Sequence, residues 1–363
     1  MKLFNTPFRP AMLWSVLPFG FVAALIVLAV LMPMPAAASA LMPLASDFGI
    51  ESLGLAGLAF GGLVISKAEL DALRTTFRAD FKEGLKRAES IWKRIATPVP
   101  SSSKSNTYGW LGKAPSFREW IGPRVIQSMN EHSYTLVNKH FENTVGVDLD
   151  DWDDDNLGTY TPLFQEMGEE TEVFPDELLF ALIEAAETEL CYDGQPFFDT
   201  EHPVYANHDG TGATTLVSNL SGAGAEPAWY LLDCSRYLKP FIVQNRTPPN
   251  FVQMNQPNDE GVFMNNEVRF GVDTRINVGL GFWQMARKST LPLTAANFEA
   301  EREAMRAVRG DGDKKLRIRP TILLCGASLE SAGEKILKAQ LVNGGDTNTN
   351  AGKCELLSVD WLD

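Results

Sequence analysis

The clearest pattern in the sequence is an alternation of apolar and polar positions between Val268 and Phe282. Nearly every second side chain there is apolar, which places these side chains on one face of an extended strand. Gly271, Gly279 and Gly281 allow bends or bulges in so long a strand. Shorter apolar runs predict further strands at residues 229–232, 241–244, 316–325 and 354–361.

Helical periodicity begins at Ser66, which forms a capping box with Glu69. One face of this predicted helix carries Leu70, Leu73, Phe77 and Phe81. The helix is expected to end near Gly84, and the Pro- and Ser-rich residues 98–105 predict a flexible linker. This part of the chain therefore predicts an amphipathic arm.

Two more helices are expected between residues 148 and 186. Residues 153–156 provide N-caps and negative charge for the first helix, and Gly168 is expected to end it. Pro175 opens the second helix, as proline often does at a helix N-terminus. A Tyr-Asp-Gly turn at residues 192–194 then leads into an aromatic segment.

The remaining patterns predict a hairpin, a long loop and two capped helices. Residues 117–147 lack long helical periodicity, alternate in part and contain a plausible turn at residues 129–131, which predicts strands joined by a turn. A lone two-stranded hairpin is marginal in water. Residues 207–225 are rich in Gly, Thr, Ser and Asn and predict a loop. Thr294 and Ser328 are expected to cap two later helices. Helices alternating with mostly antiparallel strands predict an α+β fold.

The composition is that of an ordinary globular protein, with 45% hydrophobic and 21% charged residues among 363. A chain of this length can bury a large core and form two or three subdomains. Its net charge of −14 argues against a nucleic-acid-binding module, which needs excess Lys and Arg for phosphate contacts. The four cysteines include no Cys-x-x-Cys pair, so we expect a reduced chain.

An acidic run resembles a calcium loop only in its first half. Asp151, Asp153 and Asp155 match the first three ligands of an EF-hand. Asn156 and Pro162, however, stand where that loop requires Gly and Glu. The run therefore predicts a solvated helix start rather than a calcium site.

A zinc site is also weakly supported. Cys191, His202 and His208 are close in sequence, but their spacing matches no common zinc motif and no fourth ligand is evident. His202 is instead expected to shape a turn whose backbone is held by Asp199 and Glu201. We therefore predict no metal ligand here.

No enzymatic motif is complete in the sequence. Residues 326–335 follow a predicted strand and open a helix, as a phosphate loop does, but Glu334 separates Gly333 from Lys335 and breaks the required spacing. There is no Gly-x-Ser-x-Gly elbow, and the four histidines have no fixed relation to a nucleophile. The chain is therefore predicted not to be an enzyme, with no catalytic, cofactor-binding or metal-binding residue.

Several long motifs resemble, in order, the major head subunit family of Mu-like phages. They include YGWLGKAPSFREWIG at 108–122, DDNLGTY at 154–160, PDELLFALI at 175–183, CYDGQPFFDTEHPVY at 191–205 and FGVDTRINVGLGFWQMA at 270–286. The resemblance begins near residue 66 and continues to the end of the chain. It implies the tailed-phage capsid fold of the Hong Kong-97 type, an α+β fold.

The resemblance also implies a division of the chain into segments. These are an apolar leader at 1–63, an N-terminal arm at 64–107, an extended hairpin (E-loop) at 108–147, spine helices with the start of the peripheral domain at 148–206, the remaining peripheral and axial domains at 207–345, and a C-terminal strand at 346–363. Trp110, Trp120 and Trp152 fall in the arm, hairpin and acidic-run segments, where aromatic side chains suit either core packing or anchoring of subunit contacts.

The implied function is structural. A major capsid protein of a Mu-like phage or prophage self-assembles through pentamers and hexamers into the icosahedral shell around the DNA. The implied partners are copies of itself, a scaffold or protease and a portal protein, with no sequence-specific nucleic acid, no membrane and no cofactor. The virion capsid, assembled in the host bacterial cytoplasm, is the expected location. A non-viral compartment shell of the same fold is the alternative.

The N-terminal residues point elsewhere. Lys2 and Arg9 precede an uncharged apolar run at residues 11–32, and residues 38–40 fit a small-residue cleavage site, as in a secretory signal peptide. The run is also long enough to span a bilayer. A genuine leader would favour an exported hydrolase or binding protein. We expect instead that residues 1–63 are upstream sequence read through from a misassigned start and are not part of the working subunit, because an exported subunit cannot build a head around cytoplasmic DNA.

Overall fold

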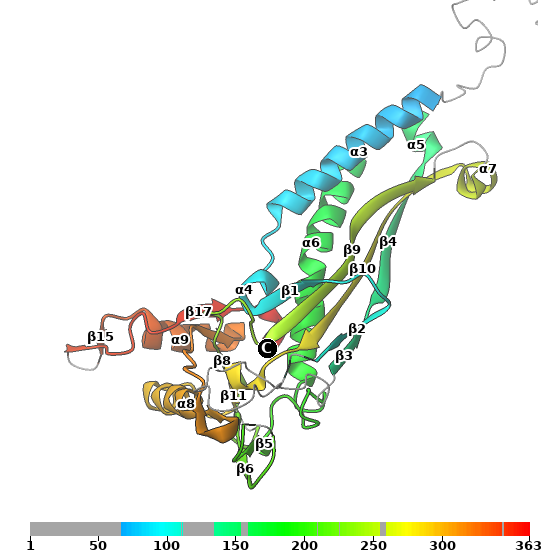
Figure 1. The fold of residues 1–363 in the computed structure, drawn as a ribbon. Helices are drawn as coiled ribbons and strands as arrows, with labels where there is room; N and C mark the ends of the chain where they lie inside the picture. The colour runs from blue at the N-terminus through cyan, green and yellow to red at the C-terminus, as the bar shows by residue number, and fades with distance from the viewer. Residues whose placement is uncertain are drawn as a thin grey trace, which may run out of the picture. The chain divides into compact units, whose positions relative to one another are not determined.

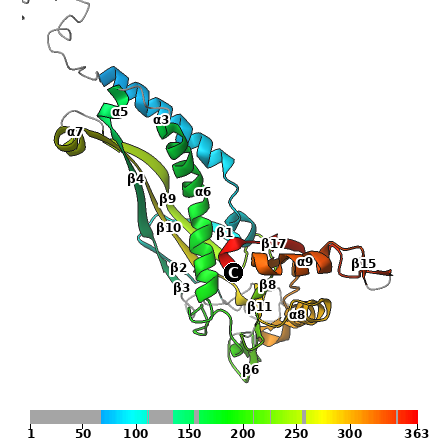
Figure 2. The ribbon, with the colours of Figure 1, turned by 180° about the vertical axis from the view of Figure 1, so that it is seen from behind.

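The structure is a computed structural model that describes residues 67–109, 111, 134–153, 159–208, 210–224, 226–254, 259–342 and 345–363. Residues 71–363 form one compact unit, and the following description concerns that unit. Two long helices lie along a first sheet, and a second sheet carries shorter helices (Figures 1 and 2). The mixture of helices with mostly antiparallel strands confirms the predicted α+β fold.

The first sheet is built around two long strands, β9 and β10. The strand order is β1–β9–β10–β4, with β1 at Ala96–Pro100, β9 at Phe241–Met254, β10 at Glu267–Leu280 and β4 at Lys139–Asp148. Strand β10 confirms the predicted alternation. Its buried apolar side chains are Val268, Phe270, Val272, Ile276, Val278 and Leu280. Strand β9 continues far beyond its predicted end, and Pro248 and Pro249 lie where its register with β10 shifts.

Aromatic rings join this sheet to the two long helices, α3 (Lys67–Arg87) and α6 (Tyr160–Ala185). Phe77 of α3 stacks on Phe164 of α6 with 4.2 Å between ring centroids. Both rings meet Phe270 of β10 edge-on at 5.3 Å. Burial of each such ring contributes about 1.5–3 kcal/mol, so this cluster is a main source of cohesion between the layers.

Helix α6 is continuous, so the predicted break between Gly168 and Pro175 is wrong. Gly168 lies where α3 crosses α6, because a Cβ there would overlap the carbonyl oxygen of Phe81. A Cβ at Gly84 would likewise overlap the carbonyl oxygen of Gln165, and α3 runs past Gly84 without ending. Both glycines therefore permit a close helix crossing rather than marking helix ends.

The residue after Pro175 fixes the short helix α4 (Trp92–Ile95) against α6. The carboxylate of Asp176 is fully buried and accepts hydrogen bonds from the backbone N–H groups of Ile91, at 2.8 Å, and Trp92. Burial raises the pKa of Asp176, and the two N–H donors partly oppose this effect. The start of α4 is therefore satisfied by a side chain distant in sequence.

The prediction that residues 98–105 form only a flexible linker is wrong in part. Residues 96–100 form β1 and pair in parallel with the start of β9. Strand β4 pairs with β10 over its whole length, so residues 139–147 belong to the first sheet rather than to an extended hairpin. The predicted hairpin residues 112–133 lie outside the described residues.

A short two-stranded ladder pairs the segments that flank residues 112–133. Strand β2 (Ser105–Tyr108) pairs with β3 (Tyr134–Val137). The Tyr108 hydroxyl donates to Oε1 of Gln244 on β9 at 2.5 Å, and Nε2 of Gln244 donates to Oδ1 of Asn138 at 2.8 Å. Burial raises the pKa of Tyr108 to about 12, which keeps the hydroxyl a donor. This buried network ties the β2–β3 ladder firmly to the first sheet.

The second sheet has the strand order β17–β14–β8–β11–β7. Its strands are β17 at Glu355–Ser358, β14 at Ile322–Cys325, β8 at Trp229–Leu232, β11 at Ala286–Ser289 and β7 at Leu220–Ser221. Every residue of β8 and β14 is buried, which explains their continuous apolar sequences. Helices α8 and α9 accompany this sheet (Figure 1). They span Ala295–Ala307 and Glu330–Leu337. Thr294 caps α8 as predicted, accepting a hydrogen bond from the Asn297 N–H.

The predicted loop at residues 207–225 contains two strands and is wrong in that part. Strand β6 (Thr214–Val217) pairs with β5 (His202–Tyr205), and β7 joins the second sheet. The other short elements are α5 at Leu149–Asp153, α7 at Glu260–Asn265, β12 at Arg309–Gly310, β13 at Lys314–Lys315, β15 at Leu341–Val342 and β16 at Asp346–Thr347. No helix within the described ranges is both long and apolar enough to cross a bilayer.

The helix crossing predicts the effect of a single methyl group. Gly168→Ala is expected to lower the free energy of unfolding by about 1–3 kcal/mol, because the new Cβ overlaps the backbone of α3. Helix propensity alone predicts the opposite sign, a gain of about 1 kcal/mol. Glu170→Ala on the exposed face of α6 is the control and should change stability little. Urea unfolding of the unassembled subunit measures both, and an unchanged midpoint for Gly168→Ala contradicts the crossing.

Candidate functional site

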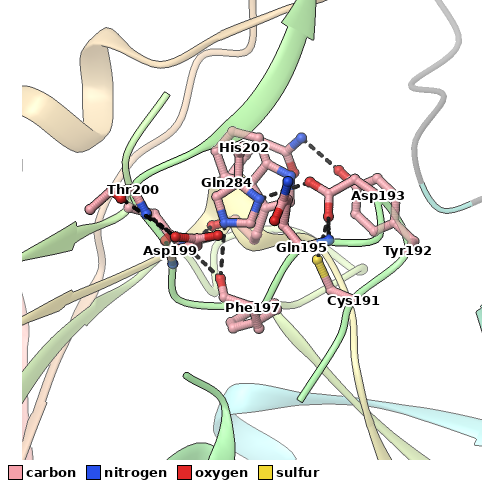
Figure 3. Close-up of polar contacts among 11 residues, drawn as sticks. Cys191, Tyr192, Asp193, Gln195, Phe197, Asp199, Thr200, His202 and Gln284 are labelled. Atoms are coloured by element: carbon pink, nitrogen blue, oxygen red, sulfur yellow. Dashed lines mark hydrogen bonds and ion pairs between the residues drawn. The ribbon is translucent and has the colours of Figure 1, made fainter. Parts of the chain in front are cut away.

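A buried cluster of polar side chains lies in the loop that follows α6 (Figure 3). The predicted turn at residues 192–194 is confirmed, and Gly194 takes the left-handed φ of 85° that this turn requires. The turn and the first residue of β5 bring Cys191, Asp193 and His202 together. Their ligand-type atoms all lie within 4.8 Å of one another.

Asp193 is the centre of this cluster. Its carboxylate accepts hydrogen bonds from His202 Nδ1 at 2.8 Å, from the Cys191 thiol at 2.9 Å and from the Gln195 N–H at 3.1 Å. Burial alone would raise the pKa of Asp193, but these donors and the charge of His202 outweigh it and lower the pKa. The carboxylate is therefore held ionised inside the fold.

His202 has acceptors at both ring nitrogens. Its fully buried ring stacks on Trp283 with 4.0 Å between centroids, while Nε2 faces the carbonyl oxygen of Phe197 at 3.2 Å. Because Nδ1 faces the Asp193 carboxylate, only the doubly protonated ring donates to both acceptors. Both members of this buried Asp193–His202 pair are hydrogen-bonded, the condition under which such a pair is tolerated.

The cluster fits a structural role better than a metal site. It is the one group of metal-capable side chains that converges within the described part of the chain. Metal binding would require a thiolate at Cys191 and a free nitrogen lone pair on His202. Burial and the neighbouring Asp193 carboxylate raise the pKa of the Cys191 thiol, which keeps its proton. The cluster instead locks the loop between α6 and the β5–β6 hairpin.

The structure changes several sequence-based expectations here. His208 lies against Gly312 and is not part of the cluster of Cys191, Asp193 and His202. The three residues weighed as zinc ligands from the sequence, Cys191, His202 and His208, therefore do not converge. The Asp199 carboxylate accepts a hydrogen bond from the Thr200 N–H at 2.6 Å, in keeping with the expectation that it holds the backbone of this turn. The His202 side chain is held by Asp193. The sequence did not reveal the role of Asp193, because the turn is needed to bring its partners together. The only sequence feature that could have pointed to it is the Asp-Gly pair that it forms with Gly194.

The phosphate-loop segment is filled by the protein itself. The Asp363 carboxylate accepts a hydrogen bond from the Ser328 N–H at 3.0 Å, which lowers the pKa of Asp363. A Cβ at Gly326 would overlap this carboxylate. Ser328 therefore does not act as the predicted N-cap of α9, because Asp363 occupies the anion position at that end.

The acidic run is described only in part. Asp151 accepts a hydrogen bond from the Tyr160 hydroxyl at 2.5 Å, while Asp155 lies outside the described residues. The side chains of the three predicted tryptophan anchors also lie outside them. All four cysteines are within the described residues and are free, as expected for a reduced chain.

Comparison with known proteins assigns the chain to a family. Residues 70–362 match the family described as Mu-like prophage major head subunit gpT. The chain is 47% identical over 305 residues to the major capsid protein of Escherichia phage Mu, a match that covers 83% of this chain and 100% of that protein. The chain belongs to the Mu-like major head subunit family. It is also 48% identical over 273 residues to the Mu-like prophage FluMu major head subunit of Haemophilus influenzae, covering 74% of this chain and 89% of that protein.

Solved structures agree with this assignment. A chain of the bacteriophage JBD30 procapsid is 49% identical with a TM-score of 0.74, and the match covers 82% of this head subunit and 100% of that chain. A chain of the JBD30 capsid is 38% identical with a TM-score of 0.64, covering 83% and 100%. The expected major capsid protein of a Mu-like phage or prophage, with a tailed-phage capsid fold, is confirmed.

The buried Asp193–His202 pair predicts a pH-dependent contribution to the stability of this head subunit. Because the folded-state pKa of Asp193 is lowered, its contribution is present above about pH 4 and is lost as the pH falls through the folded-state pKa. Asp193→Asn should cost about 1–3 kcal/mol at neutral pH, and the difference from wild type should shrink in acid.

Urea unfolding at a series of pH values measures this effect. Asp199→Asn is the matched control, since Asp199 mainly accepts a local hydrogen bond from the Thr200 N–H at 2.6 Å. An Asp193→Asn variant whose deficit is the same at every pH, or no larger than that of the control, would contradict the role given to Asp193.

Proposed function

We propose that copies of this head subunit assemble through pentamers and hexamers into an icosahedral shell that encloses the phage DNA. The observation that carries the proposal is the match to a JBD30 procapsid chain, which extends over 82% of this chain and the whole of that one. The TM-score is higher for the procapsid chain than for the capsid chain, 0.74 against 0.64. This supports a conformation closer to the procapsid form.

The residues between β2 and β3 are proposed to reach a neighbouring subunit as the extended hairpin. Tyr108 and Tyr134 pair at the end of the β2–β3 ladder, and Leu111 is fully buried. The two segments that flank residues 112–133 are thus rooted in the core. We restrict the proposed hairpin to these residues, because 139–147 form β4 of the first sheet.

The proposed role is structural, without catalysis. The buried polar groups after α6 are hydrogen-bonded to one another, and the exposed Asp363 carboxylate is hydrogen-bonded to the Ser328 N–H near the start of α9, which supports a packing function for both candidate sites. A scaffold or protease and a portal protein are the further proposed partners, and assembly is proposed to take place in the host cytoplasm. The remaining segment boundaries predicted from the sequence are retained as part of this proposal.

Residues 1–63 are proposed to lie outside the working subunit. The match to the Mu major capsid protein covers that protein completely with 83% of this chain, and the family match begins at residue 70. An uncharged apolar run on every subunit would also expose a large patch that favours aggregation or membrane insertion.

Shortening the hairpin tests the proposed assembly. Replacement of residues 112–133 by a short Gly/Ser turn should leave a folded monomer that no longer assembles, since the β2–β3 ladder and Leu111 are retained. Removal of residues 117–147 should instead unfold the chain, because it deletes β4. Sedimentation and thermal unfolding distinguish these outcomes. Normal assembly of the 112–133 replacement contradicts the proposed hairpin contact.

Mass spectrometry of purified natural particles tests the proposal for residues 1–63. The N-terminus is expected near Val64, because the recognisable subunit begins there. Peptides from residues 11–32 recovered from intact particles would overturn this proposal. A chain cleaved after Ala40 and found in the periplasm would support the exported alternative.

A further inference from the structure

A basic patch stands out on this acidic subunit. It consists of Arg236 and Lys239 from the loop between β8 and β9, and Lys314, Lys315, Arg317 and Arg319 from the segment before β14. Nη2 of Arg236 donates to the carbonyl oxygens of Leu316 and Arg317, which holds the two segments together. The chain as a whole carries a net charge of −14, so this concentration of cations is local.

Three cations of this basic patch have no acidic partner among the described residues. Burial lowers the pKa of Lys314, and the positive charges of Arg317 and Arg236 lower it further, which shows that the cations repel one another. Among the described residues, no acidic side chain forms an ion pair with Lys315, Arg317 or Arg319. The Asp233 carboxylate beneath the patch is buried and accepts a hydrogen bond from the Arg319 N–H at 2.9 Å. The exposed cations repel one another, so the patch suits an anionic partner.

Two further features suit a contact surface. Tyr237 lies between Arg236 and Lys239 in sequence and is 79% exposed. Aromatic and arginine side chains are the residues most enriched at the centres of protein interfaces. Arg317 takes a left-handed φ of 57°, which a non-glycine residue adopts at a cost. The hydrogen bonds from Arg236 to the carbonyl oxygens of Leu316 and Arg317 support this conformation.

The complementary surface is the acidic end of α6, formed by Glu184, Glu187 and Glu189. These carboxylates lie at the C-terminal end of α6, where the helix dipole is negative and disfavours negative charge. The last turn of α6 contains no basic residue that would compensate them. Lys288 pairs with Glu187 at 2.6 Å, which leaves Glu184 and Glu189 exposed and without such a partner in the described chain. The exposed Leu190 adjoins them, with 59% of its surface accessible.

These two surfaces lie toward different sides of the subunit. The basic patch adjoins α4 and β1, because the Lys239 ammonium donates to the carbonyl of Lys93 and the Lys239 N–H donates to Thr97 at 2.7 Å. The acidic end lies toward the β2–β3 ladder, since the charge of Glu189 acts on Tyr134. Figures 1 and 2 show α4 and β1 on one side of α6 and β2–β3 on the other.

We propose that the basic patch of one copy docks against the acidic end of α6 in a second copy. A contact between two different faces of identical subunits is heterologous, and its repetition closes a ring when the rotation permits. This inference rests on the proposed shell function and names one contact within it. It also explains how subunits with a net charge of −14 come together despite their overall repulsion.

Charge reversal in the full chain, expressed with its proposed scaffold partner, tests this contact. Arg317→Glu with Arg319→Glu, or Glu184→Lys with Glu189→Lys, should each reduce the sedimenting assembled fraction about tenfold or more. The chain carrying all four changes should regain assembly to within about threefold of wild type, because the opposed charges are restored. Lys335→Glu with Lys338→Glu, in the last turn of α9 and at its C-cap, changes the net charge by the same amount as the arginine reversal and is its control.

The outcomes separate the contact from the wider proposal. Failure of the fourfold variant to recover, with each variant folded by thermal unfolding, overturns the contact. Normal assembly of the chain with the reversed patch overturns the contact as well. Particles that assemble normally but lose DNA would, in addition, assign the patch to a nucleic acid. If a reversed pair does not fold, Arg317→Gln with Arg319→Gln replaces it with the same expected direction. A wild-type chain that never assembles overturns the shell function itself.

Discussion

The antiparallel pairing of β9 with β10 is the constraint on which the rest of the structure depends. The ladder joins Phe241 to Leu280 at one end and Met254 to Arg269 at the other. Strand β1 attaches to one side and β4 to the other, while α3 and α6 pack on one face through Phe77, Phe164 and Phe270. Because a one-residue slip moves every side chain to the opposite face, loss of this register would uncover the aromatic cluster and detach both helices.

Sequence patterns predicted the elements whose periodicity is local. The alternation in β10, the apolar runs of β8 and β14 and the Thr294 cap all followed from neighbouring residues. The errors arose where a distant segment decides the structure. Gly168 resembles a helix end until α3 crosses it, and the Pro-containing residues 96–100 become a strand only because β9 lies beside them.

The same distinction applies to the candidate sites. Sequence spacing did not show that Asp193 lies against His202, or that Asp363 closes the end of α9. Both carboxylates serve the fold by pairing with buried or helix-end donors. By contrast, Lys315, Arg317 and Arg319 of the basic patch and Glu184 and Glu189 at the acidic end of α6 form no ion pair with another described residue. A surface that a free subunit leaves uncompensated is where a shell protein has most to gain from its neighbours.

The central claim is that this chain works through assembly of identical copies. Electron microscopy of the purified protein, expressed with its proposed scaffold partner, tests that claim most directly. The account predicts closed icosahedral particles, or the rings and sheets from which they form, with the subunit fold described above visible in the reconstruction. A strictly monomeric species at high protein concentration, with the scaffold present, would contradict it.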